Sequence, residues 1–287
     1  MNDGGSSSPV HPRKRLGQHF LRDPHHLARI ADAADLGPGD VVLEIGPGTG
    51  TLTEVLLRRG ATVVAVELDE RLVSLLREKF AGVDRFHLIP GDILDIAPDA
   101  VVEHALGIQG PYKVVANLPY YITSAIMRHL LEAKHPPTLV VVTVQEEVGR
   151  RMCASPPHMS LLAVSVQFYG RPRIVHRIPR GAFYPVPKVN SAVVRIDVYE
   201  QPVVDVPDRD TFFRVVKAGF GQRRKQLVNA LAAGLGMSKA TARALLQTSR
   251  IDPRRRAETL SLEEWARLSW AFYSLAASSQ GGEKSNA

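Results

Sequence analysis

The residues Asn117, Leu118, Pro119 and Tyr120 follow an apolar run that is typical of a buried strand. Together they offer an amide oxygen, a rigid ring and an aromatic face. Pro119 has a fixed φ and favours an extended Leu118, which presets the direction of the Leu118 carbonyl. The segment is therefore predicted to hold a flat base against Tyr120, a stacking contact that contributes roughly 1–3 kcal/mol.

Two oxygen acceptors beside a flat base suit methylation of the amino nitrogen of adenine. The lone pair of that nitrogen is delocalised into the ring. Acceptors that bind both N–H groups can draw the nitrogen toward tetrahedral geometry. We expect the Asn117 side-chain oxygen and the Leu118 carbonyl to be these acceptors, with the adenine outside its helical stack. The methylated nitrogen loses its proton readily, so positioning carries most of the catalysis.

Other interpretations of this segment are open. The residues could form a turn with a tyrosine packed on it, in which Asn117 caps a helix from Ser124 onward. Methylation at carbon 5 of cytosine would instead need a nucleophilic cysteine. The single cysteine, Cys153, has no comparable position, which disfavours that reaction.

Three further motifs each follow a strand-like run. Gly46, Gly48 and Gly50 form a G-x-G-x-G loop, one residue shorter than the loop of dinucleotide-binding folds, which favours a ligand without phosphate. Glu67 could accept hydrogen bonds from both hydroxyls of a ribose, and Asp92 could accept one from the amine of an adenine. A nucleoside pocket is therefore expected at one edge of a sheet, unless the glycines only make a turn and the acids only cap helices.

The elements that must position these motifs alternate between strand and helix patterns. This alternation predicts the α/β class, with a Rossmann-like, mostly parallel sheet. Strands are predicted at Val41–Ile45, Thr62–Leu68, Phe86–Ile89, Lys113–Ala116 and Leu139–Val144, and helices at Thr51–Arg59, Asp69–Phe80 and Ser124–Ala133. Two later runs, Leu161–Tyr169 and Ser191–Tyr199, are predicted to form an antiparallel edge.

A small all-α domain is predicted after the linker Gln201–Asp208. Ser238 is a candidate N-cap, and Ser261 with Glu264 matches a capping box. The expected division is a tail at 1–12, a larger domain at 13–205, a helical domain at 206–277 and a tail at 278–287, with both tails disordered. The predicted helices are Thr211–Phe220, Arg223–Leu235, Ser238–Gln247 and Leu262–Ala276.

Positive charge is concentrated in the helical domain. The chain has a net charge of +7, and Arg209–Arg256 contains 12 Lys/Arg against 2 Asp/Glu. Arg223, Arg224 and Lys225, which are expected to open a helix, are predicted to contact RNA phosphates, with Arg254–Arg256 as a second stripe. The alternative for such a run is a solvated helix face.

Composition narrows the class of protein further. The 287 residues are 45% hydrophobic, which allows a sizeable core, and one cysteine excludes an intrachain disulfide. The ten histidines lack metal-ligand spacing, so no metal site is expected. No apolar run reaches the roughly 18 residues of a spanning helix, and no signal peptide is evident. A cytoplasmic protein that does not contact membranes is predicted.

The glycine loop and the two acids resemble those of class I S-adenosylmethionine-dependent methyltransferases. Over about residues 13–275, the chain is similar to the bacterial 16S rRNA adenine N6,N6-dimethyltransferases, the kasugamycin-resistance family. The segments that carry the resemblance occur in family order: RKRLGQHFL, EIGPGTGTLT, VELD, GDIL, NLPYYIT, AFYPVPKVNSAVVR, GQRRKQLVNAL and IDPRRRAETLS.

The resemblance implies a cofactor, a substrate and site residues. S-adenosyl-L-methionine would contact His19, Leu21, Gly46, Glu67, Asp92 and Asn117. The target amine would be held by Asn117, Leu118 and Tyr120, with Phe183 as a second aromatic near the base, although Phe183 could also be a core residue. The implied substrate is a pair of adjacent adenosines in the 3'-terminal hairpin of 16S rRNA, on an assembling small subunit. A monomer is expected.

Two alternatives to this function are kept. The sister family dimethylates an adenine in 23S rRNA, but the segments QRRKQLVNAL and IDPRRRAETLS favour the small-subunit group. A non-catalytic ribosome-assembly or nucleic-acid-binding factor on the same fold would not need intact cofactor residues. The presence of Gly46, Glu67, Asp92 and Asn117 argues against it.

Overall fold

A computed structural model describes residues 12–13 and 17–281. They divide into two compact units: one extends through Gly149 and includes Arg171–Glu200, and the other contains Arg150–Gly170 and the chain from Gln201 onward. The segment 150–170, predicted to belong to the larger domain, thus groups with the helical unit. Of the predicted tails, 1–11 and 282–287 lie outside the described residues, while the last helix continues to Gly281.

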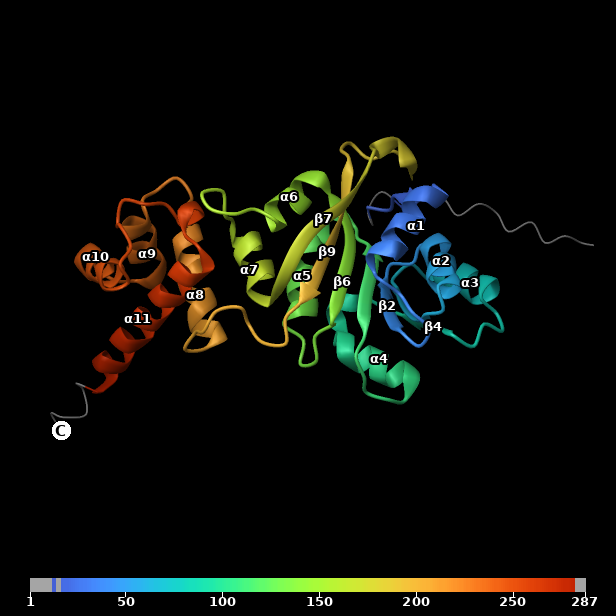
Figure 1. The fold of residues 1–287 in the computed structure, drawn as a ribbon, viewed down its shortest axis with the longest axis horizontal. Coiled ribbons are helices and arrows are strands. Elements are labelled where there is room, and N and C mark those ends of the chain that lie inside the picture. The colour runs from blue at the N-terminus through green and yellow to red at the C-terminus, as the bar shows by residue number, and fades with distance from the viewer. Residues whose placement is uncertain (1–11, 14–16, 282–287) are drawn as a thin grey trace, which may run out of the picture. The chain divides into compact units, whose positions relative to one another are not determined.

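The first unit contains a seven-stranded sheet with the order β4-β3-β2-β5-β6-β9-β7 (Figure 1). Strands β2 to β6 pair in parallel, and β9 runs antiparallel to β6. The five predicted parallel strands are confirmed to within one residue. The strands are β2 (Val41–Ile45), β3 (Thr62–Glu67), β4 (Phe86–Pro90), β5 (Lys113–Asn117), β6 (Leu139–Gln145), β7 (Gly170–Ile178) and β9 (Ser191–Val198).

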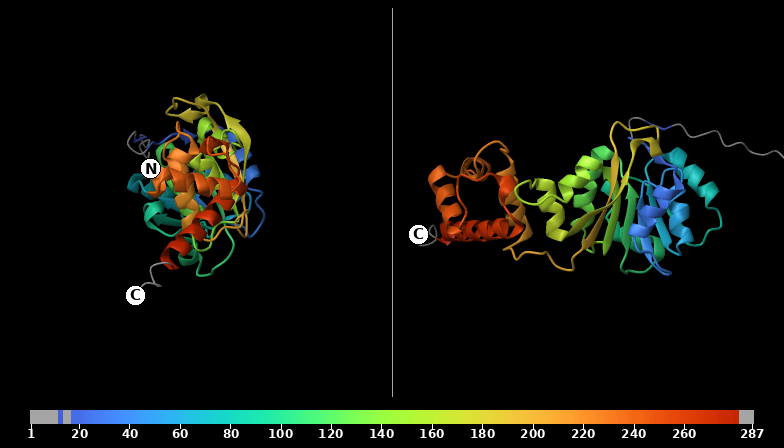
Figure 2. Two further views of the ribbon diagram at one scale, coloured as in Figure 1. Left: turned by 90° about the vertical axis from the view of Figure 1, so that its left-hand side faces the viewer. Right: turned by 45° about the horizontal axis from the view of Figure 1, so that its top comes forward.

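Helices cover both faces of this sheet (Figure 2). Val63 and Ala65 pack in one buried cluster with Ile30 and Leu56, whereas the intervening Val64 is equally buried. Successive strand residues point to opposite faces, so both faces must be covered, which explains the continuous apolar runs. The helices are α1 (Pro24–Ala33), α2 (Thr51–Arg58), α3 (Glu70–Lys79), α4 (Pro98–Leu106), α5 (Thr123–Leu131) and α6 (Glu146–Met152).

A small second sheet joins two distant parts of the first unit. Strand β1 (Phe20–Leu21) pairs antiparallel with β8 (Phe183–Tyr184), so that Leu21 lies opposite Phe183. Helix α1 begins shortly after β1, where the Asp23 carboxylate accepts a hydrogen bond from the His25 N–H at 2.9 Å. This pairing holds the N-terminal segment, residues 17–21, beside the segment that follows β7.

The prediction of a strand at Leu161–Tyr169 is wrong, because this segment is helix α7. Its cap is Ser160, whose Oγ accepts from the Ala163 N–H at 3.1 Å. An apolar run of nine residues fits a buried helix as well as a buried strand, and periodicity alone does not separate them. The strand beside β9 is β7, whose sequence GRPRIVHRI is too polar to read as a buried strand.

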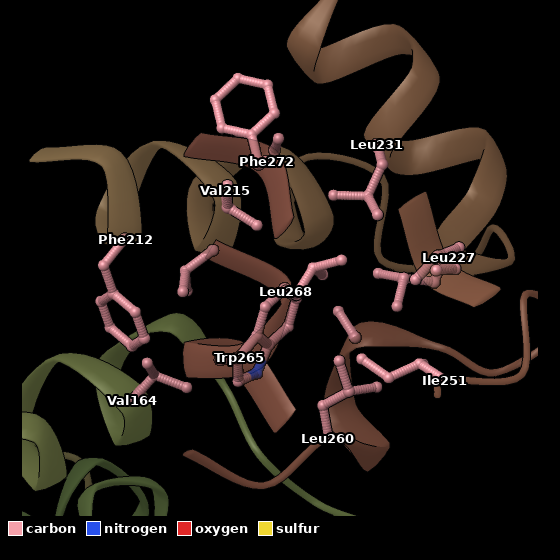
Figure 3. Close-up of a cluster of buried hydrophobic side chains, with 14 of the residues drawn as sticks. Val164, Phe212, Val215, Leu227, Leu231, Ile251, Leu260, Trp265, Leu268 and Phe272 are labelled. Atoms are coloured by element: carbon pink, nitrogen blue, oxygen red, sulfur yellow. The ribbon is translucent and has the colours of Figure 1, made fainter. Parts of the chain in front are cut away.

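The second unit packs α7 with helices α8 (Arg209–Phe220), α9 (Leu227–Leu235), α10 (Lys239–Thr248) and α11 (Leu262–Gly281). Its core surrounds the fully buried Trp265 (Figure 3). Gly219 faces that ring, and any side chain there would collide with it. The described helices include none that is long and apolar enough to cross a membrane.

Two predicted helix caps in this unit are confirmed. The Ser261 N–H donates to Glu264 Oε2 at 2.9 Å, and the Glu264 N–H donates to Ser261 Oγ at 3.3 Å, which completes the capping box. Ser238 Oγ accepts from the Thr241 N–H at 3.0 Å at the start of α10.

Candidate active site

A cavity of about 210 Å³ opens at the carboxyl ends of β2, β3, β4 and β5. It is lined by all eight residues predicted to contact the cofactor or the target amine. They come from the N-terminal segment and from the ends of four strands: His19, Leu21, Gly46, Glu67, Asp92, Asn117, Leu118 and Tyr120. The prediction that these motifs meet at one edge of the sheet is therefore confirmed.

The loop between β2 and α2 requires glycine. Gly46, Gly48 and Gly50 have φ angles of 65°, 62° and 77°, in the left-handed region that disfavours side chains. The Gly46 N–H donates to the Val66 carbonyl at 2.9 Å, which ties the loop to β3. A Cβ on Gly48 would lie 3.1 Å from the Phe20 ring. The N-terminal segment therefore closes directly on this loop.

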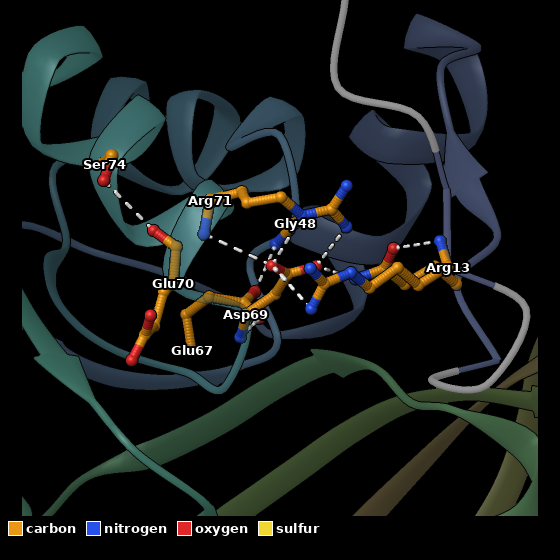
Figure 4. Close-up of polar contacts among 8 residues, drawn as sticks. Arg13, Gly48, Glu67, Asp69, Glu70, Arg71 and Ser74 are labelled. Carbon is orange, nitrogen blue, oxygen red and sulfur yellow. Dashed lines mark hydrogen bonds and ion pairs between the residues drawn. The ribbon is translucent and has the colours of Figure 1, made fainter.

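Glu67 is held at the end of β3 by backbone donors (Figure 4). The Gly48 N–H donates to Oε2 at 3.1 Å, and the Asp69 N–H donates to Oε1 at 2.9 Å. Burial is the largest influence on this carboxyl and raises its pKa, while the N–H groups act in the opposite direction. Each oxygen has a second lone pair, so Glu67 can still accept two hydroxyl groups.

Asp69 connects the N-terminal segment to the corner between β3 and α3 (Figure 4). Its carboxylate accepts from Arg71 Nη2 at 2.7 Å and from Gln18 Nε2 at 3.1 Å, and it lies 3.7 Å from the Arg13 guanidinium. The hydrogen bond from Arg71 is the main cause that lowers the pKa of Asp69 to about 2. Asp69 is therefore ionised at neutral pH and anchors the segment that carries His19.

Asp92 begins the 3₁₀ turn Ile93–Asp95 after β4. Its Oδ1 accepts from the Leu94 N–H at 2.9 Å, so the residue does cap this turn. The carboxylate also lines the cavity. A carboxylate that caps through one oxygen can accept an amine through the other, so the two predicted roles are compatible.

Asn117 ends β5 with its side chain in a defined orientation. Nδ2 donates to the His19 carbonyl at 3.0 Å, so Oδ1 is presented as the acceptor. The residue is half-buried and lines the cavity. The alternative that Asn117 caps the next helix is wrong, because α5 begins at Thr123 and its N-cap residue is Ile122.

The backbone after Asn117 is held by a hydrogen bond to β6 and by burial. The Leu118 N–H donates to the Thr143 carbonyl at 3.2 Å, and the Leu118 side chain is buried. Pro119 has φ −58° and ψ 130°, an extended conformation. Strand pairing, burial and the proline ring thus together set the peptide that carries the Leu118 carbonyl.

Tyr120 forms an aromatic wall of the cavity. Its ring stacks on His19 with centroids 5.7 Å apart and an interplanar angle of 22°. Its hydroxyl lies 2.8 Å from Oγ of the fully buried Ser191, and burial raises the pKa of Tyr120. His19 Nδ1 in turn lies 2.7 Å from the Pro185 carbonyl. Ser191 and Pro185 therefore position the two rings, although neither was predicted as a site residue.

Phe183, which was predicted to lie near the target base, is a buried residue. It is 3% exposed and belongs to the buried cluster that contains Leu21, Leu27 and Ile30. It is not among the residues that line the cavity. The structure therefore favours the alternative, in which Phe183 is a core residue opposite Leu21 in the small sheet.

The basic residues of the second unit differ from the prediction in their local structure. Arg223, Arg224 and Lys225 are exposed in the turn between α8 and α9, and α9 itself begins only at Leu227. Gln226 adopts the extended conformation of an N-cap residue. We call Arg223–Lys225 the basic turn.

The second basic stripe is partly used in ion pairs. Arg254 Nη2 lies 3.0 Å from Asp252 Oδ2, and Arg255 forms a two-pronged pair with Glu264. Glu264 also completes the capping box of α11, so the pair with Arg255 stabilises the start of that helix. The prediction of RNA contact stays with the exposed Arg254 and Arg256, because the pair with Asp252 leaves the Arg254 side chain 80% exposed.

Glu44 is a buried acid on the cavity wall that the sequence analysis did not assign. It is 1% exposed, and Thr53 Oγ1 donates to its Oε2 at 2.6 Å. Burial, reinforced by the charge of Glu67, raises the pKa of Glu44 to about 8. A carboxyl in the middle of the apolar run VVLEI was the available signal, since a buried strand seldom carries an acid without a reason.

We expect Glu44→Gln to reduce the pH dependence of stability. The carboxyl is protonated in the folded protein up to about pH 8, but in the unfolded chain it ionises near its ordinary pKa of 4.5. Its stabilising effect is thus fully present below pH 4.5 and is lost as the pH rises to about 8. Thermal unfolding between about pH 5 and 8 should show a smaller fall in Tm for the variant. Equal falls in both proteins would contradict the expectation.

The fold and the cavity together define a class of protein. A largely parallel sheet with a glycine loop after one strand, and acids after the next two, is the arrangement of class I S-adenosylmethionine-dependent methyltransferases. The model of the family described as ribosomal RNA adenine dimethylase matches residues 10–272, and the chain belongs to this family. It is therefore an rRNA-modifying enzyme, with S-adenosyl-L-methionine as its methyl donor.

Individual relatives and solved structures agree with this membership. Proteins named ribosomal RNA small subunit methyltransferase A are 52% identical in Dehalococcoides mccartyi (89% of this chain, 87% of the relative) and 47% identical in Moorella thermoacetica (90% and 91%). The crystal structure of the 23S rRNA methyltransferase ErmE has a TM-score of 0.68 at 29% identity, covering 88% of this chain and 98% of that one. A dimethyladenosine transferase from Plasmodium falciparum has the same fold, with a TM-score of 0.73 at 23% identity, covering 89% and 98%.

Proposed function

We propose that this protein transfers methyl groups from S-adenosyl-L-methionine to N6 of two adjacent adenosines in the 3'-terminal hairpin of 16S rRNA. The product is N6,N6-dimethyladenosine, formed in the cytoplasm during small-subunit biogenesis. The observation that carries the proposal is the oriented amide of Asn117 at the edge of a nucleoside-sized cavity. The small-subunit target is supported by relatives of that name at 47–52% identity, against 29% for the 23S enzyme.

The residues of the cavity fit the methyl donor. Glu67 keeps acceptor capacity for the two ribose hydroxyls, and Asp92 keeps an oxygen for the adenine amine. The backbone at Gly46 lets the ligand approach closely, since nothing lies within 4 Å of its missing Cβ. His19 and Leu21 would close the site from the N-terminal segment. S-adenosyl-L-methionine supplies, when bound, an electrophilic methyl group on its sulfonium sulfur.

The target amine is held by oxygens that this chain fixes in advance. Asn117 Oδ1 and the Leu118 carbonyl accept the two N–H bonds of the adenine, and Tyr120 stacks on the base. These two hydrogen bonds direct the nitrogen lone pair toward the cofactor side of the cavity. After transfer the nitrogen is strongly acidic and loses its proton to water. The rate enhancement is thereby assigned to positioning and to preset acceptor dipoles.

The basic turn of the helical unit is proposed to bind rRNA phosphates. Its three cations are exposed, and Arg209–Arg256 carries far more Lys/Arg than Asp/Glu. Arginine suits phosphate because its planar guanidinium donates two parallel hydrogen bonds. The turn lies outside the described cavity, so binding and chemistry can be separated by mutation.

The double variant Arg223→Glu/Arg224→Glu should bind small subunits more weakly and with a salt slope lower by about 2, because two phosphate contacts are lost. Its affinity for S-adenosyl-L-methionine should not change. Filter binding over a series of salt concentrations measures both effects. Arg77→Glu/Lys134→Glu makes the same charge change at exposed sites on the first unit and is the control. If both double variants behave alike, the basic turn has no special role.

Transfer of tritiated methyl groups tests the proposed substrate. We expect unmodified 30S subunits to accept label on adjacent adenosines, and 50S subunits to accept none. Label in 23S rRNA would instead support the sister activity. A protein that binds subunits but transfers no label and binds no S-adenosyl-L-methionine would be the non-catalytic factor. Sedimentation of the active protein should give a monomer.

A further inference from the structure

Three histidines that are distant in the sequence meet on the first unit. His25 and His26 lie in the first turn of α1, and His176 lies in β7. One ring nitrogen of each lies within 4.8 Å of the others. The ring centroids are 5.5 Å (His25–His26), 5.9 Å (His25–His176) and 5.1 Å (His26–His176) apart. We call these residues the histidine trio.

We propose that the histidine trio binds a divalent transition metal, with zinc as the best match. Three imidazole nitrogens and one water make a four-coordinate site that suits zinc, cobalt, nickel or copper and not magnesium or calcium. Nitrogens bound tetrahedrally at about 2.0–2.1 Å lie roughly 3.4 Å apart, and their ring centroids lie roughly 5.2 Å apart. The observed centroid separations of 5.1–5.9 Å are close to that arrangement.

Little movement is needed to admit the ion. His26 Nδ1 and His176 Nε2 share a hydrogen bond of 2.8 Å, so metal binding would shift the proton between them to another nitrogen or to water and separate the two atoms by roughly half an ångström. His25 is exposed and can rotate toward them. Arg29, also on α1, contributes positive charge near His176 and opposes a cation. Binding is therefore expected to be reversible by a chelator rather than permanent.

Because of the position of the trio, a bound ion would connect two segments of the first unit. His25 and His26 follow β1 closely in the sequence, and β7 leads through the turn Arg180–Ala182 into β8. Strands β1 and β8 already pair with each other. A bound metal would join the same two segments a second time. It would stiffen the N-terminal segment, whose His19 and Leu21 line the cofactor cavity.

Titration of the full-length, tag-free protein with Co²⁺ and Zn²⁺ tests the site directly. We expect one Co²⁺ per chain with the intense visible absorption of four-coordinate cobalt, displaced by Zn²⁺ and removed by EDTA. His26→Ala/His176→Gln should lose roughly tenfold or more in affinity, equivalent to at least about 1.4 kcal/mol. His104→Ala, at an exposed histidine on α4, should bind like the wild type.

Hydrogen exchange supplies a second readout that does not depend on activity. Zn²⁺ should slow amide exchange in residues 17–22 and 183–184 of the wild type and leave the double variant unchanged. Circular dichroism of the double variant without metal establishes that it is folded. The proposal is overturned if the wild type shows no saturable binding. It is also overturned if the double variant binds as tightly as the wild type, or if exchange in these segments does not respond to Zn²⁺.

Discussion

Replacing Asn117 with alanine is expected to lower methyl transfer by a factor of roughly 10²–10³ or more, the usual effect of removing one preset polar group that acts on the reacting centre. The variant removes Oδ1, so one N–H of the target amine has no acceptor. The nitrogen then stays planar and conjugated with the ring. Binding of rRNA should remain near wild type, because the helical unit is untouched. Single-turnover transfer to 30S subunits, with filter binding alongside, separates the two effects.

Two further variants sharpen this test. Asn117→Asp keeps an acceptor but replaces the donor that faces the His19 carbonyl, so repulsion should misplace the side chain and transfer should still fall. Gln109→Ala removes an exposed amide from a loop outside the cavity and should have no effect. Transfer by Asn117→Ala at close to the wild-type rate would rule out the amine clamp.

The second large effect is expected for Glu67→Gln, which should weaken binding of S-adenosyl-L-methionine roughly tenfold to a hundredfold. The new amide nitrogen must face the N–H of either Gly48 or Asp69, and an unpaired buried donor costs about 1–3 kcal/mol. The substitution also removes an acceptor for one ribose hydroxyl. Isothermal titration calorimetry with S-adenosyl-L-methionine measures the change.

Glu70→Gln is the matched control for this variant. Glu70 lies three residues further along the chain, is exposed on α3 and does not line the cavity, so its neutralisation should leave cofactor affinity unchanged. Binding of rRNA should be the same in both variants. An unchanged dissociation constant for Glu67→Gln would mean that the ribose is held elsewhere.

The parallel sheet and the cavity could be predicted because both depend on local patterns. A strand covered on both faces is largely apolar, as β2, β3, β5 and β6 are, whereas the edge strand β4 is only partly buried. Parallel strands end at a common edge, so Gly46, Glu67, Asp92 and Asn117 had to converge once the strands were placed. The capping box of Ser261 and Glu264 was equally local.

What escaped prediction depends on contacts between distant residues. The run Leu161–Tyr169 is apolar enough for either a strand or a helix, and burial among the C-terminal helices suits it as a helix. Phe183 could be assigned to the core only once its partner Leu21 was known. Asp69 with Gln18 joins residues 51 positions apart, and His26 with His176 joins residues 150 apart. No spacing in the sequence indicates such pairs.

If Asn117 holds the target amine as proposed, its hydrogen bond to the His19 carbonyl makes turnover depend on an ordered N-terminal segment. A carboxamide can flip by half a turn, and without that carbonyl its two orientations are close in energy. In the flipped state an NH₂ group would face the substrate nitrogen and repel its hydrogens. An enzyme whose first segment is detached would thus retain every catalytic side chain yet hold the wrong end of one of them toward its substrate.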